Sequence, residues 1–199
     1  MEFNIDTNTV MIYEFFRYRN MEILPKLITE RLTLRPLAES DAQKIFLLRS
    51  DILINKYLDR MPCNSLADAV SFIQRIRKGY HYYWAIVTKG KEELAGTICL
   101  YDLSEDEKRC GIGFELFAEF QGKGIMKEAA TRIIEYSFHA LGVKTIDAYT
   151  HKENKRSINL LIALKFIYID PVDGYNPNLT LFRLTKKAGL AVKEECGTS

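Results

Sequence analysis

A glycine-containing segment between an expected strand and an expected helix constrains this chain most. The segment reads Gln121-Gly122-Lys123-Gly124-Ile125-Met126, and an expected strand at 111–117 precedes it. After it, an apolar stripe at helical spacing predicts a helix that stops at Gly142; the stripe consists of Met126, Ala129, Ala130, Ile133, Ile134 and Phe138. A helix amino terminus leaves N–H groups unpaired and directs its positive dipole end outward, and glycines let an anion approach. The segment therefore predicts a phosphate-binding loop, to which Lys123 adds a cation and Gln121 a side-chain donor.

Two glycines one residue apart do not by themselves separate an anion site from a structural turn. The pattern differs from the P-loop of NTPases, because no Ser or Thr follows the Gly-Lys pair. It also lacks the full glycine spacing of dinucleotide-binding folds. Nucleotide hydrolysis and hydride transfer are therefore disfavoured.

The rest of the pattern predicts a mixed α/β domain. Strands are expected at 28–34, 82–88, 93–101, 111–117, 145–150, 166–169 and 179–184, and further helices near 40–52, at 66–78 and at 154–164. The first helix is expected to place Ile45, Leu48 and Ile52 on one apolar face. Because strands and helices do not alternate regularly, the order indicates a mixed sheet with helices on both faces rather than a doubly wound one.

Length and composition fit one domain. The chain has 199 residues, 47% of them hydrophobic, and no Gly, Pro or Ser-rich linker divides it. We expect a domain over 21–185, an extension over 1–20 and a polar tail over 186–199. Two alternatives stay open for the extension: translation begins at Met21, or residues 1–20 pack on the domain.

Charge and residue usage exclude several classes of partner. The net charge of +2 is too balanced for a nucleic-acid binder. No apolar stretch approaches the length of a membrane span, so we expect no membrane partner and a cytoplasmic location. The four cysteines and three histidines lack paired metal-ligand spacing, which predicts free thiols and no metal site.

Four blocks resemble, in order, the GNAT acetyltransferase superfamily, and most closely its ribosomal-protein-alanine acetyltransferase branch. They lie between residues 27 and 166. The blocks are the opening strand Leu27 to Pro36, the central strand Ile112 to Leu116, the loop Gln121 to Met126, and Asn154 to Ser157 with the aliphatic residues that follow. The sequence departs from the branch at Gly111, which replaces an acid, and at Lys165, which replaces a glycine. It departs from the superfamily at Met126, which replaces a small residue, and at Leu161, which replaces a tyrosine on which the branch does not depend.

The resemblance implies a mostly antiparallel central sheet, splayed at its central strands and flanked by helices. It also implies acetyl-CoA as acyl donor and direct attack of a primary amine on the thioester, with no metal and no covalent enzyme intermediate. A backbone N–H at Leu116 or Phe117 would stabilise the oxyanion. The implied cofactor-binding residues are Leu116, Phe117, Gln121, Gly122, Lys123, Gly124, Ile125, Met126 and Asn154.

Two residues are candidates for proton transfer. Glu115, on the central strand, is the expected general base; the alternative is a glutamate that is salt-bridged or faces solvent. Ser157 is expected to protonate the leaving thiolate, with a structural hydrogen bond in an early helical turn, or protonation by solvent, as alternatives.

Two further groups of residues bear on the acceptor. Tyr80, Tyr82, Tyr83 and Trp84 could line its pocket, although core packing is the favoured interpretation. In the enzymes resembled, the loop that contains Asp59, Arg60 and Asn64 frames the acceptor site.

These features together predict an acetyl-CoA-dependent N-acetyltransferase acting on a primary amine, with a protein amino terminus as the acceptor that the branch implies. Amino acids, polyamines, other small amines and antibiotics stay open as acceptors. Two other classes also stay open: a CoA-binding or regulatory domain that has lost catalysis, and an unrelated protein that binds a nucleotide. A homodimer is the expected assembly.

Overall fold

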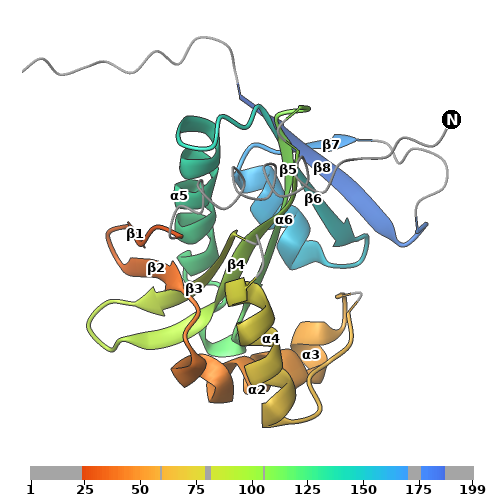
Figure 1. Ribbon diagram of the computed structural model, residues 1–199. Coiled ribbons are helices and arrows are strands. Elements are labelled where there is room, and N and C mark those ends of the chain that lie inside the picture. The colour runs from red at the N-terminus through yellow and green to blue at the C-terminus, as the bar shows by residue number, and fades with distance from the viewer. Residues whose placement is uncertain (1–23, 59, 79–81, 105, 170–175, 187–199) are drawn as a thin grey trace, which may run out of the picture.

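The computed structural model describes residues 24–58, 60–78, 82–104, 106–169 and 176–186. They form an eight-stranded sheet in the order β1-β2-β3-β4-β5-β6-β8-β7, with helices on both faces (Figure 1). The strands are β1 (Leu27–Ile28), β2 (Leu32–Pro36), β3 (Tyr82–Thr88), β4 (Glu93–Ser104), β5 (Arg109–Leu116), β6 (Thr145–His151), β7 (Ile167–Ile169) and β8 (Leu179–Thr185). The helices are η1 (Glu39–Asp41), α2 (Ala42–Ser50), α3 (Ile52–Asn55), α4 (Leu66–Lys78), η2 (Ala118–Phe120), α5 (Ile125–His139) and α6 (Lys155–Ala163). The expected extension, Asp59, Tyr80 and the tail beyond Lys186 lie outside the described residues.

The sheet is splayed at its centre, as expected. All neighbouring strands pair antiparallel apart from β5 and β6, which run parallel. The parallel pairing covers only Arg109–Gly111 against Thr145–Asp147, although β5 continues to Leu116 and β6 to His151. Beyond Gly111, one edge of β5 is therefore without a strand partner among the described residues.

Helices α5, α2 and α4 cover the two faces of the sheet. The stripe expected on α5 is confirmed: Ala129, Ala130 and Ile133 are fully buried in the larger core cluster, against strand residues such as Ile98 and Ile112. The smaller cluster packs α2 and α4 on the other face of the sheet; its helical members include Ile45, Ala69, Phe72 and Ile73. Burying a large apolar side chain contributes about 1.5–3 kcal/mol, so both layers are held mainly by this contact.

The strand expected at 28–34 is wrong: the segment is a tight hairpin of β1 and β2. The N–H of Thr29 donates to the carbonyl of Leu32 at 3.0 Å, and its Oγ1 accepts from the N–H of Leu32 at 3.0 Å. Leu27 consequently pairs with Leu34. A threonine side chain closes this turn without glycine or proline, so the usual turn signal is missing.

The expectation that Ile52 extends the apolar face of the first helix is also wrong. Asp51 ends α2 in an extended conformation and caps α3, because its carboxylate accepts N–H bonds from Leu53 at 2.7 Å and Ile54 at 3.0 Å. Ile52 is then 85% exposed. The expected helix 66–78 is confirmed as α4, and the Ser65 hydroxyl accepts from its first turn.

Lys165, which stands where the resembled branch has glycine, adopts a left-handed conformation. Its φ is 68°, in the left-handed region, and the N–H of Phe166 donates to the carbonyl of Leu161 at 3.0 Å. The end of α6 is thereby kept, at a strain of about 1–2 kcal/mol for an L-residue. No described helix is long and apolar enough to cross a membrane.

Candidate active site

The loop between β5 and α5 has the backbone that an anion site requires. Gly122 and Gly124 have φ of 73° and 75°, and a Cβ on Gly122 would meet nothing within 4 Å. Helix α5 begins directly afterwards, so its first N–H groups lack partners within the helix. The side chains of Ile125 and Met126 are buried in the core and anchor the start of α5 there. The large Met126 is thus accommodated behind the loop.

The side chain of Gln121 lies between the end of β5 and α6. Its Nε2 donates to the carbonyl of Leu116 at 2.9 Å, and its Oε1 accepts from Arg156 on α6. The amide therefore connects the end of β5 to α6. It also brings Arg156, which the sequence does not single out, to the loop as a cation.

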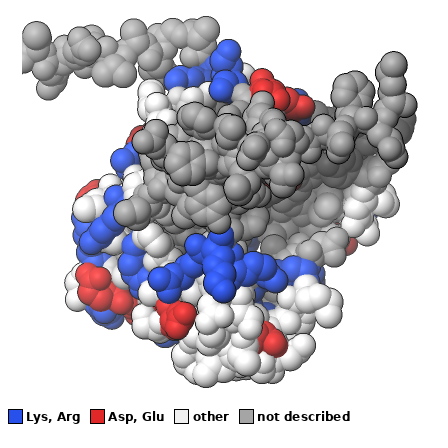
Figure 2. All heavy atoms as spheres, in the orientation of Figure 1, with Lys and Arg blue, Asp and Glu red and all other residues white. Residues whose placement is uncertain are grey.

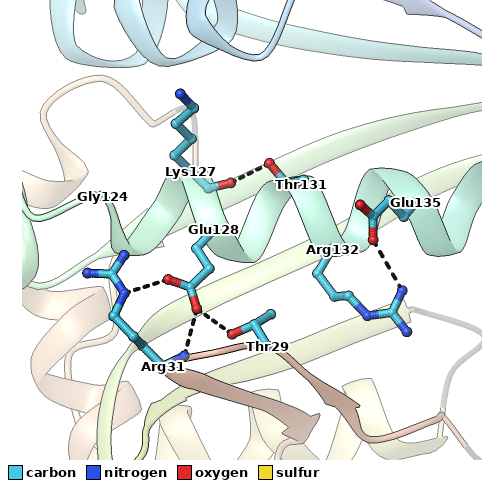
Figure 3. A pocket seen from close by; sticks show the side chains of 8 residues that line it. All are labelled: Thr29, Arg31, Gly124, Lys127, Glu128, Thr131, Arg132 and Glu135. Atoms are coloured by element: carbon cyan, nitrogen blue, oxygen red, sulfur yellow. Dashed lines mark hydrogen bonds and ion pairs between the residues drawn. The ribbon is translucent and has the colours of Figure 1, made fainter.

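An ion pair that we call the Arg31–Glu128 clamp holds the loop from the other side (Figure 3). Arg31 donates from Nε to Glu128 at 2.6 Å, from its backbone N–H to the same carboxylate at 2.8 Å, and from Nη1 to the carbonyl of Lys123 at 3.1 Å. Thr29 Oγ1 adds a bond to Glu128 of 2.6 Å. Partial burial alone would raise the pKa of Glu128, but the bonds from Thr29 and Arg31 lower it below its ordinary value. The clamp fixes the loop carbonyl and compensates a negative charge in the first turn of α5.

The backbone hydrogen bonds of β5 distinguish between Leu116 and Phe117, the two expected oxyanion donors. The N–H of Phe117 already donates to the carbonyl of Ala95 on β4 at 2.9 Å, so its expected role as donor is corrected. N–H groups alternate in direction along a strand. That of Leu116 therefore points away from β4, to the side from which β6 has separated. Leu116 is the candidate donor.

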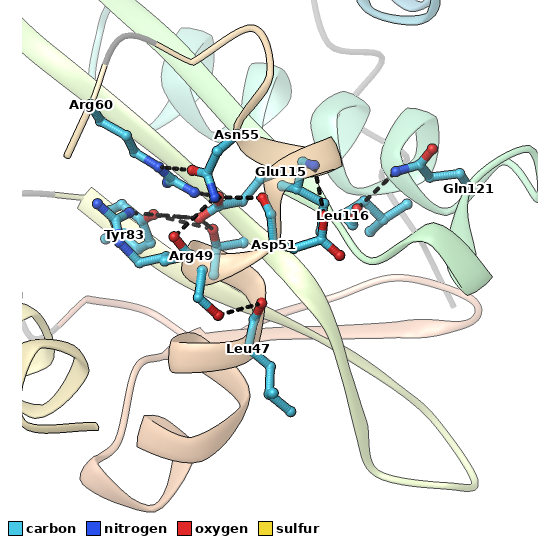
Figure 4. A network of polar contacts seen from close by, with 12 residues as sticks. Leu47, Arg49, Asp51, Asn55, Arg60, Tyr83, Glu115, Leu116 and Gln121 are labelled. Carbon is cyan, nitrogen blue, oxygen red and sulfur yellow. Dashed lines mark hydrogen bonds and ion pairs between the residues drawn. The ribbon is translucent and has the colours of Figure 1, made fainter. Parts of the chain in front are cut away.

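Glu115 lies in a buried polar network on the face of the sheet that α2 and α4 cover (Figure 4). Its Oε1 accepts from Thr97 at 2.9 Å and Tyr83 at 3.3 Å, and its Oε2 accepts from Arg60. Nη1 of Arg49 lies 3.8 Å from Oε1. The carboxylate expected as a base is therefore a buried, ion-paired group, as the alternative interpretation proposed.

Burial raises the pKa of two neighbours of this network. It raises the pKa of Tyr83 well above its ordinary value, and the Glu115 charge adds to the effect. Burial, followed by Glu115, raises the pKa of Cys99 to about 12. Both side chains are therefore neutral near pH 7.

The aromatic residues of β3 divide between the two faces. Trp84 is fully buried and its ring lies 5.9 Å from that of Tyr82 and 5.8 Å from that of Tyr136, so these residues pack in the core, as favoured. Tyr83 instead bonds to Glu115 from the opposite face.

Glycine at position 111, where the branch has an acid, makes room for Tyr101. A Cβ on Gly111 would lie 2.3 Å from the ring of Tyr101. A carboxylate side chain cannot occupy this position while the ring is there.

Asn154 and Ser157 lie at the start of α6. The side chain of Asn154 caps the helix by accepting from the N–H of Ser157 at 3.2 Å. Because Arg156 contacts Gln121, the structure brings this block beside the loop, as expected.

A hollow adjoins the Glu115 network where α2 ends and α3 and the following loop begin. We call it the acceptor-side hollow, and it is lined by Phe46, Ser50, Ile52, Asn55, Lys56, Arg60, Pro62, Cys63 and Asn64. Arg60 connects the hollow to Glu115 and is held by Asn55, which accepts from its Nε at 2.8 Å. No cluster of three metal-binding side chains occurs in the part of the chain that the structure describes.

The comparisons identify the family. Residues 31–167 match the acetyltransferase (GNAT) domain, and the chain belongs to this family. It is 31% identical over 148 residues to the uncharacterised N-acetyltransferase YoaA of Bacillus subtilis, covering 72% of this chain and 84% of that protein. The chain is thus an N-acetyltransferase of the GNAT type, as the sequence predicts.

Solved structures share the fold. An acetyltransferase (GNAT family) from Bacillus anthracis has a TM-score of 0.73 at 18% identity, covering 81% of this chain and 98% of that chain. The spermidine N-acetyltransferase from Vibrio cholerae, in complex with CoA and spermine, has a TM-score of 0.69 at 20% identity, covering 79% and 96%. At these identities the likeness concerns the fold alone.

Proposed function

We propose that this acetyltransferase binds acetyl-CoA between the loop at 121–126 and the open edge of β5, where a primary amine attacks the thioester directly. The early separation of β5 from β6 carries this proposal, because it exposes strand backbone beside a phosphate-binding loop. Lys123, Arg156 and the first N–H groups of α5 would hold the phosphates. Asn154 and Ser157 would lie near the pantetheine and sulfur.

The N–H of Leu116 would stabilise the oxyanion that forms when the amine nitrogen bonds to the carbonyl carbon. One such donor contributes about 2.7–4 kcal/mol to lowering a barrier of this kind. Collapse of the intermediate breaks the C–S bond. Ser157 or solvent then protonates the thiolate.

Glu115 is our proposed acceptor for the amine proton, directly or through water. It is a buried carboxylate one residue before the oxyanion donor, on the face opposite α5. Its bonds to Arg60 and Thr97 favour a second role, in which it positions the loop around the acceptor. Removal of the Glu115 carboxylate should lower activity in either role. Only loss of a general base should also change the pH dependence of the rate.

The pH profile of Glu115→Gln tests the role. As the base, Glu115 gives a variant with low kcat and a changed acid limb of the rate profile, at unchanged acetyl-CoA affinity. As a positioning residue, it gives a variant with raised KM for the amine and an unchanged profile. A variant with wild-type kinetics would remove both roles.

The acceptor that we propose is a protein amino terminus. Beside the acceptor-side hollow, the large apolar residues Ile52, Leu53 and Met61 are exposed, as suits contact with a peptide chain. Thiol release with acetyl-CoA and a panel of amino-terminal peptides, amino acids and polyamines tests this. Turnover confined to polyamines would overturn the peptide assignment.

A cytoplasmic homodimer completes the proposal. The cytoplasm supplies acetyl-CoA, and a two-fold dimer is the commonest assembly of soluble chains. Sedimentation of the full chain tests the dimer, and a single monomeric species would contradict it.

A further inference from the structure

We infer that the acceptor carries a carboxylate a few bonds from its reactive amine, and that the acceptor-side hollow binds this carboxylate. The inference rests on the proposed function and narrows its acceptor class. The observation behind the inference concerns the described residues between Glu115 and the acceptor-side hollow, where guanidinium and ammonium groups outnumber carboxylates.

Arg49 has hydrogen-bonding capacity that the protein leaves unused. The residue is 9% exposed, and its buried Nε has no hydrogen-bond partner in the described structure. Its guanidinium lies 4.0 Å from the centroid of the Phe72 ring, and its Nη1 approaches Glu115 only to 3.8 Å, beyond hydrogen-bond length. Glu115 meanwhile accepts from other donors, so this carboxylate does not satisfy both arginines.

The described lining of the acceptor-side hollow also has more cationic than anionic side chains. Lys56 and Arg60 line the hollow together with the neutral polar residues Ser50 and Asn64, and no Asp or Glu is among the described residues of the lining. Because of Lys56 and Arg60, the hollow favours an anion. On the face shown in Figure 2, a band of basic side chains runs across the middle, above the position of α4, but this helix contributes no residue to the described lining of the hollow.

Two described acids close to the hollow, Asp51 and Glu153, do not remove this preference. The carboxylate of Asp51 is used in capping α3. Glu153 lies close enough to Lys56 to support its charge, adding to the larger effect of Tyr57, which raises the pKa of Lys56. Both acids are outside the lining of the hollow.

A zwitterionic acceptor matches this arrangement. Its amine would lie at Glu115, and its carboxylate would meet Arg60 and Lys56. A polyamine would instead place a second ammonium against these cations, where like charges repel. Such an acceptor is a peptide with an acidic residue next to its amino terminus. A free amino acid carries the same two groups, and the test below distinguishes the two sources.

Matched acceptors test the inference by thiol release from acetyl-CoA. Alanine is compared with alaninamide, and the peptide Ala-Asp-amide with Ala-Asn-amide, beside spermidine. We expect kcat/KM to fall about tenfold or more when the carboxylate of the preferred acceptor becomes an amide, the usual scale for losing a charged hydrogen-bonded group. The first pair responds if the source is an amino acid, and the second if it is an acidic peptide.

A variant without the Lys56 charge tests whether the hollow causes the preference for a carboxylate. Lys56→Gln should weaken the preference for carboxylate over amide, through KM more than kcat, because Lys56 does not contact Glu115. Arg132→Gln, which removes a cation on α5 outside the hollow, should leave the preference unchanged. Equal rates for carboxylate and amide, or a preference for spermidine, would overturn the inference while leaving the acetyltransferase proposal intact. Failure of every amine to release thiol would overturn both.

Discussion

Because the Arg31–Glu128 clamp holds the loop at 121–126, we predict that Arg31, on the turn between β1 and β2, controls the affinity for acetyl-CoA. In Arg31→Gln, the side-chain bond of 2.6 Å to Glu128 and that of 3.1 Å to the Lys123 carbonyl are lost. Glu128 keeps the hydroxyl of Thr29 and the backbone N–H of residue 31, but its charge is no longer compensated. The variant should therefore loosen the loop and place an uncompensated anion near the phosphates.

The expected loss is modest because the clamp is at the surface. A hydrogen bond to a charged group contributes about 1.5–3 kcal/mol, and exposed ion pairs contribute about 0–1 kcal/mol. The Arg31 side chain is 48% exposed, so we discount the first figure and expect about 1–2 kcal/mol. This corresponds to a rise of about 5–30-fold in the dissociation constant of acetyl-CoA.

Calorimetry of acetyl-CoA binding measures this change, with urea denaturation to establish that each variant is folded. Arg132→Gln is the matched control, because Arg132 pairs at 3.6 Å with Glu135 on the same helix and this ion pair does not include the loop or Glu128. At saturating acetyl-CoA, Arg31→Gln should keep its kcat. Affinity within about twofold of wild type, or an equal loss in Arg132→Gln, would refute the clamp's role.

Three further predictions concern stability and the thiol nearest the network. Lys165→Gly should raise the free energy of unfolding by about 0.5–1 kcal/mol in urea, because relief of the left-handed strain exceeds the entropy cost of glycine; a decrease would contradict this. Burial alone would raise the pKa of Asp147, but hydrogen bonds from Arg183 and Arg109 lower it. Its stabilisation is thus full above about pH 4 and is lost as pH falls through the folded pKa, so the difference in stability between wild type and Asp147→Asn should shrink towards pH 3; a constant difference would count against it. Cys99→Ala should keep kcat within about twofold and wild-type protein should form no acetyl-enzyme, because the thiol stays protonated; mass spectrometry of an acetylated cysteine would refute this.

Local patterns predicted the parts of the fold that local interactions determine. The bounds of α4 follow from apolar spacing and a serine cap, and the loop follows from glycines between a strand and an amphipathic helix. The turn between β1 and β2 was missed because the side chain of Thr29 closes it. Ile52 was misplaced because the cap at Asp51 interrupts a continuous apolar spacing.

The parts of the site that could not be predicted depend on contacts across the fold. Arg31 and Glu128 are 97 residues apart, and Arg60 and Glu115 are 55 apart, so no sequence spacing connects either pair. The hydrogen bond from the Phe117 N–H to Ala95 follows from the register between β4 and β5. The alternation of apolar and polar residues along the sequence does not specify this register.

Calorimetric titration of the full chain with acetyl-CoA measures whether the loop at 121–126 and the open edge of β5 bind this donor. We expect saturable binding at one site per chain, with CoA competing well and ATP poorly, because the open edge of β5 would bind the pantetheine that ATP lacks. Absence of binding, or competition by ATP as strong as that by CoA, would contradict this expectation.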